Sequence, residues 1–285
     1  MINKIQDYKE FTKFGLARIV VLSAGLGFLY ADHTHIDWLK LIILLIGGFL
    51  VTGASNGFNQ IMERDLDALM KRTAQRPLPD NRMSTREGLW LALLMATLGV
   101  TLLTVFVNFL CAILAALSLV LYTLVYTPSK QVTPWSVFLG AIPGATSPML
   151  GYIAVTNHID FDALLLFGIQ FIWQFPHFWA IAWVLDEDYS RAGFKMLPSK
   201  GGRTKESAFQ ALVYSASLLP IGILPYTMHR VNGWATIIII VAGIIFTLQA
   251  IRLYKQCSVE AARKLMFGSF IYLPVVQLAM VLGKI

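Results

Sequence analysis

The chain has 285 residues, of which 56% are hydrophobic and only 14% are charged. Its mean hydropathy is +0.64, and a water-soluble domain of this size cannot bury so much apolar surface. The composition therefore excludes a disordered chain, a coiled coil and nearly every soluble fold. The apolar residues also form unbroken runs rather than alternating ones, which argues against an outer-membrane barrel. The sequence predicts an all-α, polytopic membrane protein.

Nine apolar segments are long enough to cross a bilayer, whose core needs roughly 20 helical residues. The predicted spans are 14–31, 38–58, 88–106, 109–126, 135–156, 162–184, 207–228, 234–251 and 265–283. We interpret residues 1–285 as a single transmembrane domain. The polar stretches 59–87 and 186–206 are its two long inner loops, and function is expected there.

The formal net charge of +7 reflects Lys and Arg residues that gather in the loops on one side of the predicted spans. By the positive-inside rule, this bias places the N-terminus and both long loops in the cytoplasm. The surplus charge is thus explained by membrane topology, and no nucleic-acid partner is expected. The two cysteines lie in an apolar run and in a polar loop, so we expect neither a disulfide nor a cysteine-rich metal site.

The first long loop opens with polar residues at a regular spacing. If the second span continues inward as a helix, Asn59, Glu63 and Asp67 recur every four residues and share one face, whereas Asp65 points the other way. Oxygen ligands of this kind select hard cations, so Mg²⁺ is the expected metal. From the spacing alone, an ordinary solvated loop at the membrane edge is an equally good interpretation.

Basic residues follow the acidic ones, as a diphosphate site requires. Arg72 and Arg76, beside Lys71, can hold phosphate oxygens while metal ions bridge others. In the second long loop, Glu187 and Asp188 are expected to complete a metal position, and Lys195 to reach the same phosphate. A solvated loop remains the alternative there too.

Several motifs together resemble the intramembrane prenyltransferase superfamily and, within it, the protohaem IX farnesyltransferase (haem O synthase) family. They comprise the stretch Asn59–Pro79, Tyr126-Thr127-Pro128 with Lys130 and Thr133, Phe175–Ala180, Asp188-Tyr189, Ala192-Gly193 and Met196-Leu197-Pro198. The resemblance covers nearly the whole chain. Three departures stand out: Glu63 replaces the usual Asp, Leu185 stands where related enzymes have an Asp, and the common Lys-Pro-Arg near the first span is missing. Lys13 and Arg18 are its nearest remnants.

The resemblance implies a ring of nine helices around a central cavity in the cell inner membrane. It implies transfer of a farnesyl group from farnesyl diphosphate to a vinyl group of haem B, with addition of water. Mg²⁺ is then the cofactor, haem B a substrate, and the downstream haem A synthase a further partner. By position, the metal ligands are Asn59, Glu63, Asp67, Glu187 and Asp188. The phosphate contacts are Arg72, Arg76, Lys130 and Lys195, and Tyr126 lies at the substrate.

His177 is the one histidine that the sequence places within a span, among aromatic residues. An ionisable group inside the membrane is a functional candidate by default. It can ligate haem iron, orient a substrate, or be hydrogen-bonded inside the bundle. Aromatic side chains around it, such as Trp173 and Phe178, suit a chamber that keeps water from an allylic cation.

Two other functions remain open at this stage. One is a sister enzyme that prenylates a quinone precursor or another aromatic acceptor, against which the motif around His177 argues. The other is a cation-coupled transporter, but transporter charges lie near mid-membrane in broken helices. Here they lie at one face beside a basic cluster, which favours the enzyme.

Overall fold

The computed structural model of the chain describes residues 2–32, 34–199 and 201–285. Within them, nine helical stretches are long and apolar enough to cross a membrane, which confirms the predicted spans. They are α2 (Phe14–Ala31), α3 (Trp38–Met62), α5 (Thr85–Phe106), the continuous run Phe109–Val132, α8 (Ser136–Thr156), α9 (Phe161–Val184), α11 (Lys205–Thr227), α12 (Gly233–Gln256) and α13 (Val259–Leu282). The run Phe109–Val132 comprises α6 (Phe109–Val120), the π-helical turn η1 (Leu121–Tyr126) and α7 (Thr127–Val132).

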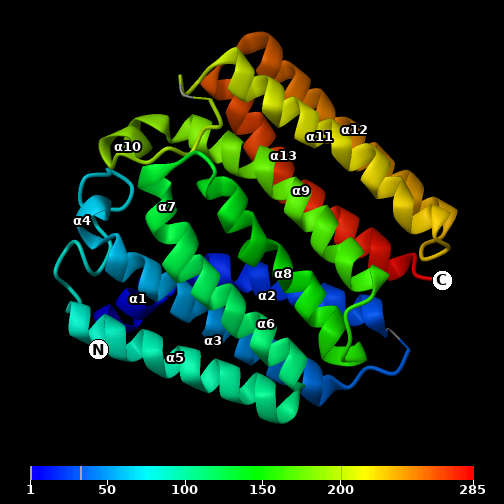
Figure 1. Ribbon diagram of the computed structural model, residues 1–285, viewed down its shortest axis with the longest axis horizontal. Helices are drawn as coiled ribbons and strands as arrows, with labels where there is room; N and C mark the ends of the chain where they lie inside the picture. Colours follow the sequence, from blue (N-terminus) through cyan, green and yellow to red (C-terminus); the bar gives the residue numbers. More distant parts are fainter. Residues whose placement is uncertain (1, 33, 200) are drawn as a thin grey trace.

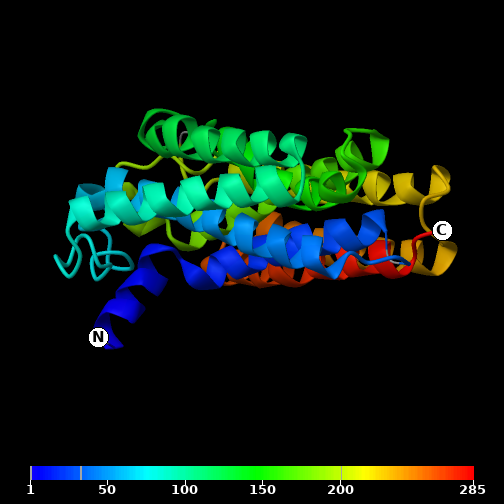
Figure 2. The same cartoon turned by 90° about the horizontal axis from the view of Figure 1, so that it is seen from below.

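The remaining helices are short and gather at one end of the bundle. They are α1 (Ile2–Phe11), α4 (Arg64–Asp67) and α10 (Asp186–Arg191). Figure 1 shows them at the left-hand end of the bundle, with the C-terminus at the opposite end, and Figure 2 shows α1 projecting away from the bundle. We call the end that carries α1, α4, α7 and α10 the site end. Both polar loops therefore meet at one end, as the sequence predicts.

Several helices continue beyond their apolar stretches at the site end. Helix α3 extends to Met62, whereas the predicted span ends at residue 58. Helix α12 extends to Gln256 rather than to the predicted 251, and α13 begins at Val259 rather than at the predicted 265. A hydropathy criterion ends a span at the first charges, whereas the backbone hydrogen bonds continue through them. The predicted boundaries are therefore short at this end.

Small residues allow a close backbone contact between α2 and α8. A Cβ on Gly27 would lie 1.9 Å from the carbonyl oxygen of Pro148, and one on Gly151 would lie 1.8 Å from that of Ala24. Membrane helices associate through such close backbone approach, because lipid offers no hydrophobic drive to bring them together. Any larger residue at Gly27 or Gly151 would push the two helices apart.

At the end opposite the site, a cluster of charged residues connects segments that are distant in the sequence. Asp162, near the start of α9, lies 3.1 Å from Arg230 and 3.6 Å from Lys284. The Lys284 ammonium also lies 3.8 Å from the centre of the Tyr30 ring, at the end of α2. The first and last spans are therefore joined here, and the contacts between α2 and α13 close the arrangement of helices.

Candidate active site

The first acidic motif lies where α3 ends and α4 begins. Asn59, Glu63 and Asp67 are 0%, 4% and 1% exposed, whereas Asp65 is exposed to solvent. The predicted uninterrupted helix is wrong in detail, because Glu63 (φ −99°, ψ 10°) breaks it. Even so, the Glu63 N–H donates to the Asn59 carbonyl at 3.0 Å and the Asp67 N–H to the Glu63 carbonyl at 2.7 Å. These bonds preserve the four-residue spacing that turns the three side chains inward.

Each of the three side chains accepts a contact from a cation that comes from a different part of the chain. The Lys13 ammonium donates to Asn59 Oδ1 at 2.9 Å. The Lys130 Nζ lies 2.8 Å from one Glu63 oxygen, and Arg76 donates to Asp67 Oδ2 at 2.7 Å. Three basic groups thus face two carboxylates and one amide in a largely buried cluster at the site end. We call Asn59, Glu63, Asp67 and their three basic partners the acid–base cluster.

Lys13 is a member of this cluster, although in the sequence it is only a remnant of the missing Lys-Pro-Arg motif. It sits at the corner between α1 and α2 with φ 48°, a left-handed conformation that non-glycine residues seldom adopt. Side chains of α3 hold this corner: Gln60 donates to the carbonyls of Glu10 and Phe11 at 2.9 and 2.8 Å, and Asn56 to that of Thr12 at 3.1 Å. A signal existed in the sequence, because Lys13 directly precedes the first span.

The electrostatic surroundings of Lys13 favour an anionic ligand. Burial, together with the nearby Arg76 and Lys130 charges, lowers the pKa of Lys13 well below its usual value. An anion placed among the three basic groups would reverse this effect, because opposite charge favours the ammonium form.

The π-helical turn in the fourth span aligns a second side of the site. The Thr127 hydroxyl donates to the Tyr122 carbonyl, five residues earlier, at 2.9 Å. Its oxygen also accepts from Asn59 Nδ2 at 3.2 Å, so both ends of the Asn59 amide are fixed. One turn further, Lys130 Nζ lies 4.7 Å from the centre of the Tyr126 ring. The motifs in the sequence point to Tyr126 and Lys130, whereas this role of Thr127 depends on the fold.

A compact, buried loop presents Arg76. The hydroxyl of Thr73, which is fully buried, donates to the main-chain carbonyl of Asp67 at 2.8 Å. Leu78 and Met70 are also buried in this loop. Because the loop folds back on the residue that Arg76 contacts, the guanidinium group is held with only 18% of the side chain exposed.

The second acidic loop joins the first through Asp188. Its carboxylate accepts from the main-chain N–H groups of Lys71 and Arg72 at 3.2 and 3.4 Å. Arg191 also donates to it, at 3.2 Å. These contacts bring the two loops together, and they make Asp188 an anchor for the basic segment that leads to Arg76.

Other predicted contacts of the two loops point elsewhere. The Glu187 side chain is 80% exposed, and its Oε1 lies 3.9 Å from Arg203. Lys195 is exposed, with its Nζ 3.4 Å from the Val132 carbonyl, and the Arg72 side chain is exposed as well. The structure therefore does not bring these three side chains to the acid–base cluster.

The donor set of the cluster fits Mg²⁺. Among the described residues, no three His, Cys, Asp or Glu side chains converge as a complete ligand set. Mg²⁺ does not need one, because proteins usually hold it through one or two carboxylates plus substrate phosphates and water. Asp67 Oδ1 is buried and has no hydrogen-bond partner among the described residues, so it retains acceptor capacity for a metal. Glu63 and Asn59 supply the other hard oxygen atoms.

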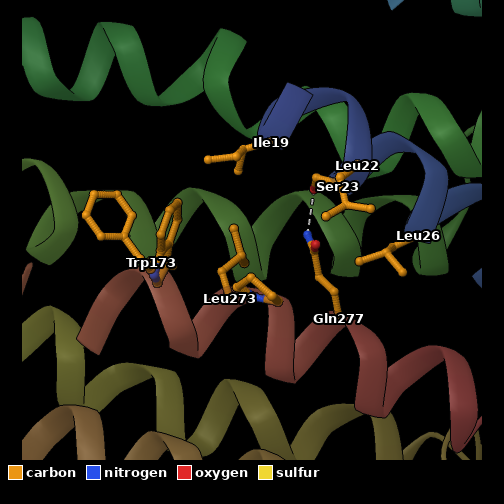
Figure 3. A pocket seen from close by; sticks show the side chains of 9 residues that line it. Ile19, Leu22, Ser23, Leu26, Trp173, Leu273 and Gln277 are labelled. Atoms are coloured by element: carbon orange, nitrogen blue, oxygen red, sulfur yellow. Dashed lines mark hydrogen bonds between the residues drawn. The ribbon is translucent and has the colours of Figure 1, made fainter. Parts of the chain in front are cut away.

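His177 lies deep in α9, away from the loops. Its ring stacks on Trp173 at 4.4 Å between centres, and its Nδ1 lies 2.7 Å from Ser269 Oγ on α13. Trp173 and Phe270, which both contact His177, line a recess of about 40 Å³ between α2, α9 and α13. In Figure 3 the recess also holds a polar pair, with Gln277 donating to Ser23 at 2.7 Å.

Most other aromatic side chains of α9 serve helix packing. Phe171 and Phe175 make edge-on or tilted contacts with Phe138 of α8, and Phe175 and Trp179 pack on Tyr214 of α11. Of the aromatic chamber predicted from the sequence, only the aromatic side chains around His177 are candidates in this region. A central cavity stays a prediction.

Comparison with known proteins agrees with this geometry. The UbiA prenyltransferase family profile matches residues 20–273. The chain belongs to the UbiA prenyltransferase family. It is 48% identical to the protoheme IX farnesyltransferase of Cytophaga hutchinsonii over 285 residues, which is 100% of both chains. The protein of the same name from Flavobacterium psychrophilum is 43% identical, over 98% of this chain and 94% of the relative.

Solved structures show the same fold. A digeranylgeranylglyceryl phosphate synthase structure superposes with a TM-score of 0.80 at 21% identity, covering 99% of this chain and 98% of the other. A UbiA homologue from Archaeoglobus fulgidus, bound to GPP and Mg²⁺, gives a TM-score of 0.72 at 14% identity, with 96% and 99% covered. The all-α membrane fold predicted from the sequence is therefore confirmed.

Proposed function

We propose that this UbiA family member transfers a farnesyl group from farnesyl diphosphate to a vinyl group of haem B, giving haem O and diphosphate. The observation that carries the proposal is the acid–base cluster, which offers three basic groups and three hard oxygen donors at one end of an apolar bundle. The names of the full-length relatives support the choice of donor and acceptor.

The basic side chains account for departure of the diphosphate. Lys13, Lys130 and Arg76 come from three segments and can hold phosphate oxygens from several sides. When the allylic C–O bond breaks, its electron pair leaves with the diphosphate, and the three cations stabilise that charge. A bound Mg²⁺, held by Asn59, Glu63 and Asp67, supplies further neutralisation of the same group.

The apolar bundle accounts for the fate of the farnesyl cation. The terminal vinyl carbon of haem attacks it, forming a C–C bond, and a second cation develops beside the porphyrin. Water adds to that cation and loses a proton, which leaves the hydroxyl group of the product. His177 and the recess beside it are proposed to lie on the acceptor side, separate from the diphosphate contacts.

The decisive experiment uses purified protein with haem B, farnesyl diphosphate and Mg²⁺. We expect diphosphate release and a porphyrin product whose mass equals haem B plus farnesyl and hydroxyl groups. Parallel reactions with EDTA test the metal, and a panel of quinone precursors tests the sister activity. Conversion of a quinone precursor but not of haem B would refute the proposed acceptor.

A variant of His177 tests the division between donor and acceptor sides. His177→Phe is expected to reduce haem O formation and haem B binding while farnesyl diphosphate binding stays near that of the unmodified protein. Equal loss of both activities would make His177 a purely structural histidine.

We also propose that the site end faces the cytoplasm, in the inner membrane, where the downstream haem A synthase can receive the product. Cys257 follows α12 at the site end and is exposed, whereas Cys111 is buried. A membrane-impermeant maleimide should therefore label Cys257 in inside-out vesicles and not in right-side-out ones. The reverse pattern would overturn this orientation.

A further inference from the structure

Ser269, a fully buried residue of α13, makes two hydrogen bonds through one hydroxyl group. Its Oγ lies 2.5 Å from the main-chain carbonyl oxygen of Met266 and 2.7 Å from His177 Nδ1. A carbonyl oxygen can only accept, so the single hydroxyl hydrogen lies between Ser269 and Met266. The Ser269 oxygen must therefore accept from His177, and Nδ1 carries the hydrogen.

This assignment determines what the other ring nitrogen can do. In a neutral imidazole that carries its hydrogen on Nδ1, Nε2 holds an unshared electron pair. No protein group within the described ranges hydrogen-bonds to His177 Nε2. The imidazole thus offers Nε2 as a metal ligand, while its other nitrogen, Nδ1, is already held by the hydrogen bond to Ser269. That is the arrangement in which histidines bind metals, since the second hydrogen bond fixes the tautomer and raises ligand basicity.

The same serine also fixes the ring's orientation through its main chain. Trp173 Nε1 donates to the Ser269 carbonyl at 3.0 Å. The Trp173 ring stacks on His177 at an interplanar angle of 18°, and Phe270 meets the imidazole edge-on at 5.1 Å between centres. Rotation of the imidazole would break the Ser269 bond and the stack at once.

We propose that Ser269 is a positioning residue that holds His177 in the Nδ1–H tautomer, so that Nε2 coordinates the iron of the haem acceptor. The inference rests on the proposed function, since it requires haem B to be the acceptor. Under this proposal the protein recognises the iron atom of haem B as well as the porphyrin ring. Ser269, on a different helix from His177, controls the contact with the iron.

The test compares haem B with metal-free protoporphyrin IX, which has the same ring and side groups but offers no iron. Both are titrated into the purified full-length protein, and binding is followed by absorbance and fluorescence. Ser269→Ala is expected to weaken haem B binding by about 10- to 100-fold, the usual effect of losing such a supporting bond. Protoporphyrin IX and farnesyl diphosphate should bind as before. In the ferrous complex, the iron–histidine stretching band should shift to lower frequency.

Ser215→Ala is the matched control, because Ser215 is also fully buried and its hydroxyl has no partner among the described residues. It should leave haem B binding unchanged. If Ser269→Ala does not fold, Ser269→Cys carries the same expectation, since a thiol is only a weak acceptor.

The outcomes separate the two proposals. If the unmodified protein neither binds nor converts haem B, the proposed function fails. If it converts haem B but Ser269→Ala binds haem B equally well, or loses haem B and protoporphyrin IX in parallel, the proposed role of Ser269 is wrong. Selective loss of haem B, with protoporphyrin IX retained, supports it.

Discussion

Replacing Asp67 by Asn tests whether the acid–base cluster performs chemistry or only holds the loop. The substitution keeps the shape of the side chain and removes its charge. Asp67 is 1% exposed and binds Arg76 at 2.7 Å, and its second oxygen has no hydrogen-bond partner within the part of the chain that the structure describes. Both its charge-assisted contact and its capacity for a metal would be weakened together.

The expected losses differ for stability and for turnover. A hydrogen bond to a charged group contributes about 1.5–3 kcal/mol. Arg76 stays partly exposed, so water can replace some of its lost contact, and we expect the unfolding free energy to fall by about 1–2 kcal/mol. Turnover loses both the metal contact and the fixed guanidinium group, so two such contributions total about 3–6 kcal/mol. At about 1.4 kcal/mol per factor of ten, kcat/KM should fall at least about 100-fold.

Asp65→Asn is the matched control, because Asp65 lies two residues away and is exposed. Diphosphate release and porphyrin product are measured for both variants, and thermal unfolding in detergent reports on folding. The reasoning is refuted if Asp67→Asn keeps a kcat/KM within about threefold of the Asp65→Asn value. It is also refuted if turnover falls only in proportion to the fraction of unfolded protein.

Three further predictions concern the surroundings of the cluster. Thr127→Val should lower kcat/KM by about 2- to 13-fold, because Asn59 loses one neutral hydrogen bond worth about 0.5–1.5 kcal/mol; an unchanged rate would contradict the role of Thr127. Asp188→Asn should raise the KM for farnesyl diphosphate more than Glu187→Gln does, since only Asp188 anchors the basic loop; equal effects would argue against that anchor. Burial and neighbouring positive charges lower the pKa of Lys13, and a bound diphosphate would raise it, so the KM should increase as pH rises above the pKa of the free protein, by at most about tenfold per pH unit. Lys13→Arg, which stays charged, should flatten this dependence, and an identical pH profile would exclude Lys13 from the diphosphate contacts.

The spans and the first acidic motif could be predicted because each depends on local sequence. Apolar length determines where a helix can cross a bilayer. A four-residue spacing placed Asn59, Glu63 and Asp67 on one side even though the helix breaks at Glu63. A prediction from a local pattern of this kind holds even where the helix is locally irregular.

The partners of those residues could not be predicted, because they depend on how distant segments meet. Lys13 reaches Asn59 only because α3 side chains hold a left-handed corner. Glu187 and Asp188 are adjacent in sequence, yet the turn of α10 sends one to solvent and the other to the first loop. The Ser269–His177 bond joins two residues, on α13 and α9, that are 92 positions apart in the chain. No periodicity in a single segment reports such contacts.

The π-helical turn at Leu121–Tyr126 amounts to one residue inserted into an otherwise regular helix. Each residue of an α-helix advances the helix by about 100°, so this insertion sets the direction in which every later side chain of the fourth span faces. Deleting one residue there would leave the composition of the span intact while rotating Lys130 away from Glu63. In an alignment of relatives, a one-residue gap at this turn would therefore mark a change of function even where every motif residue is retained.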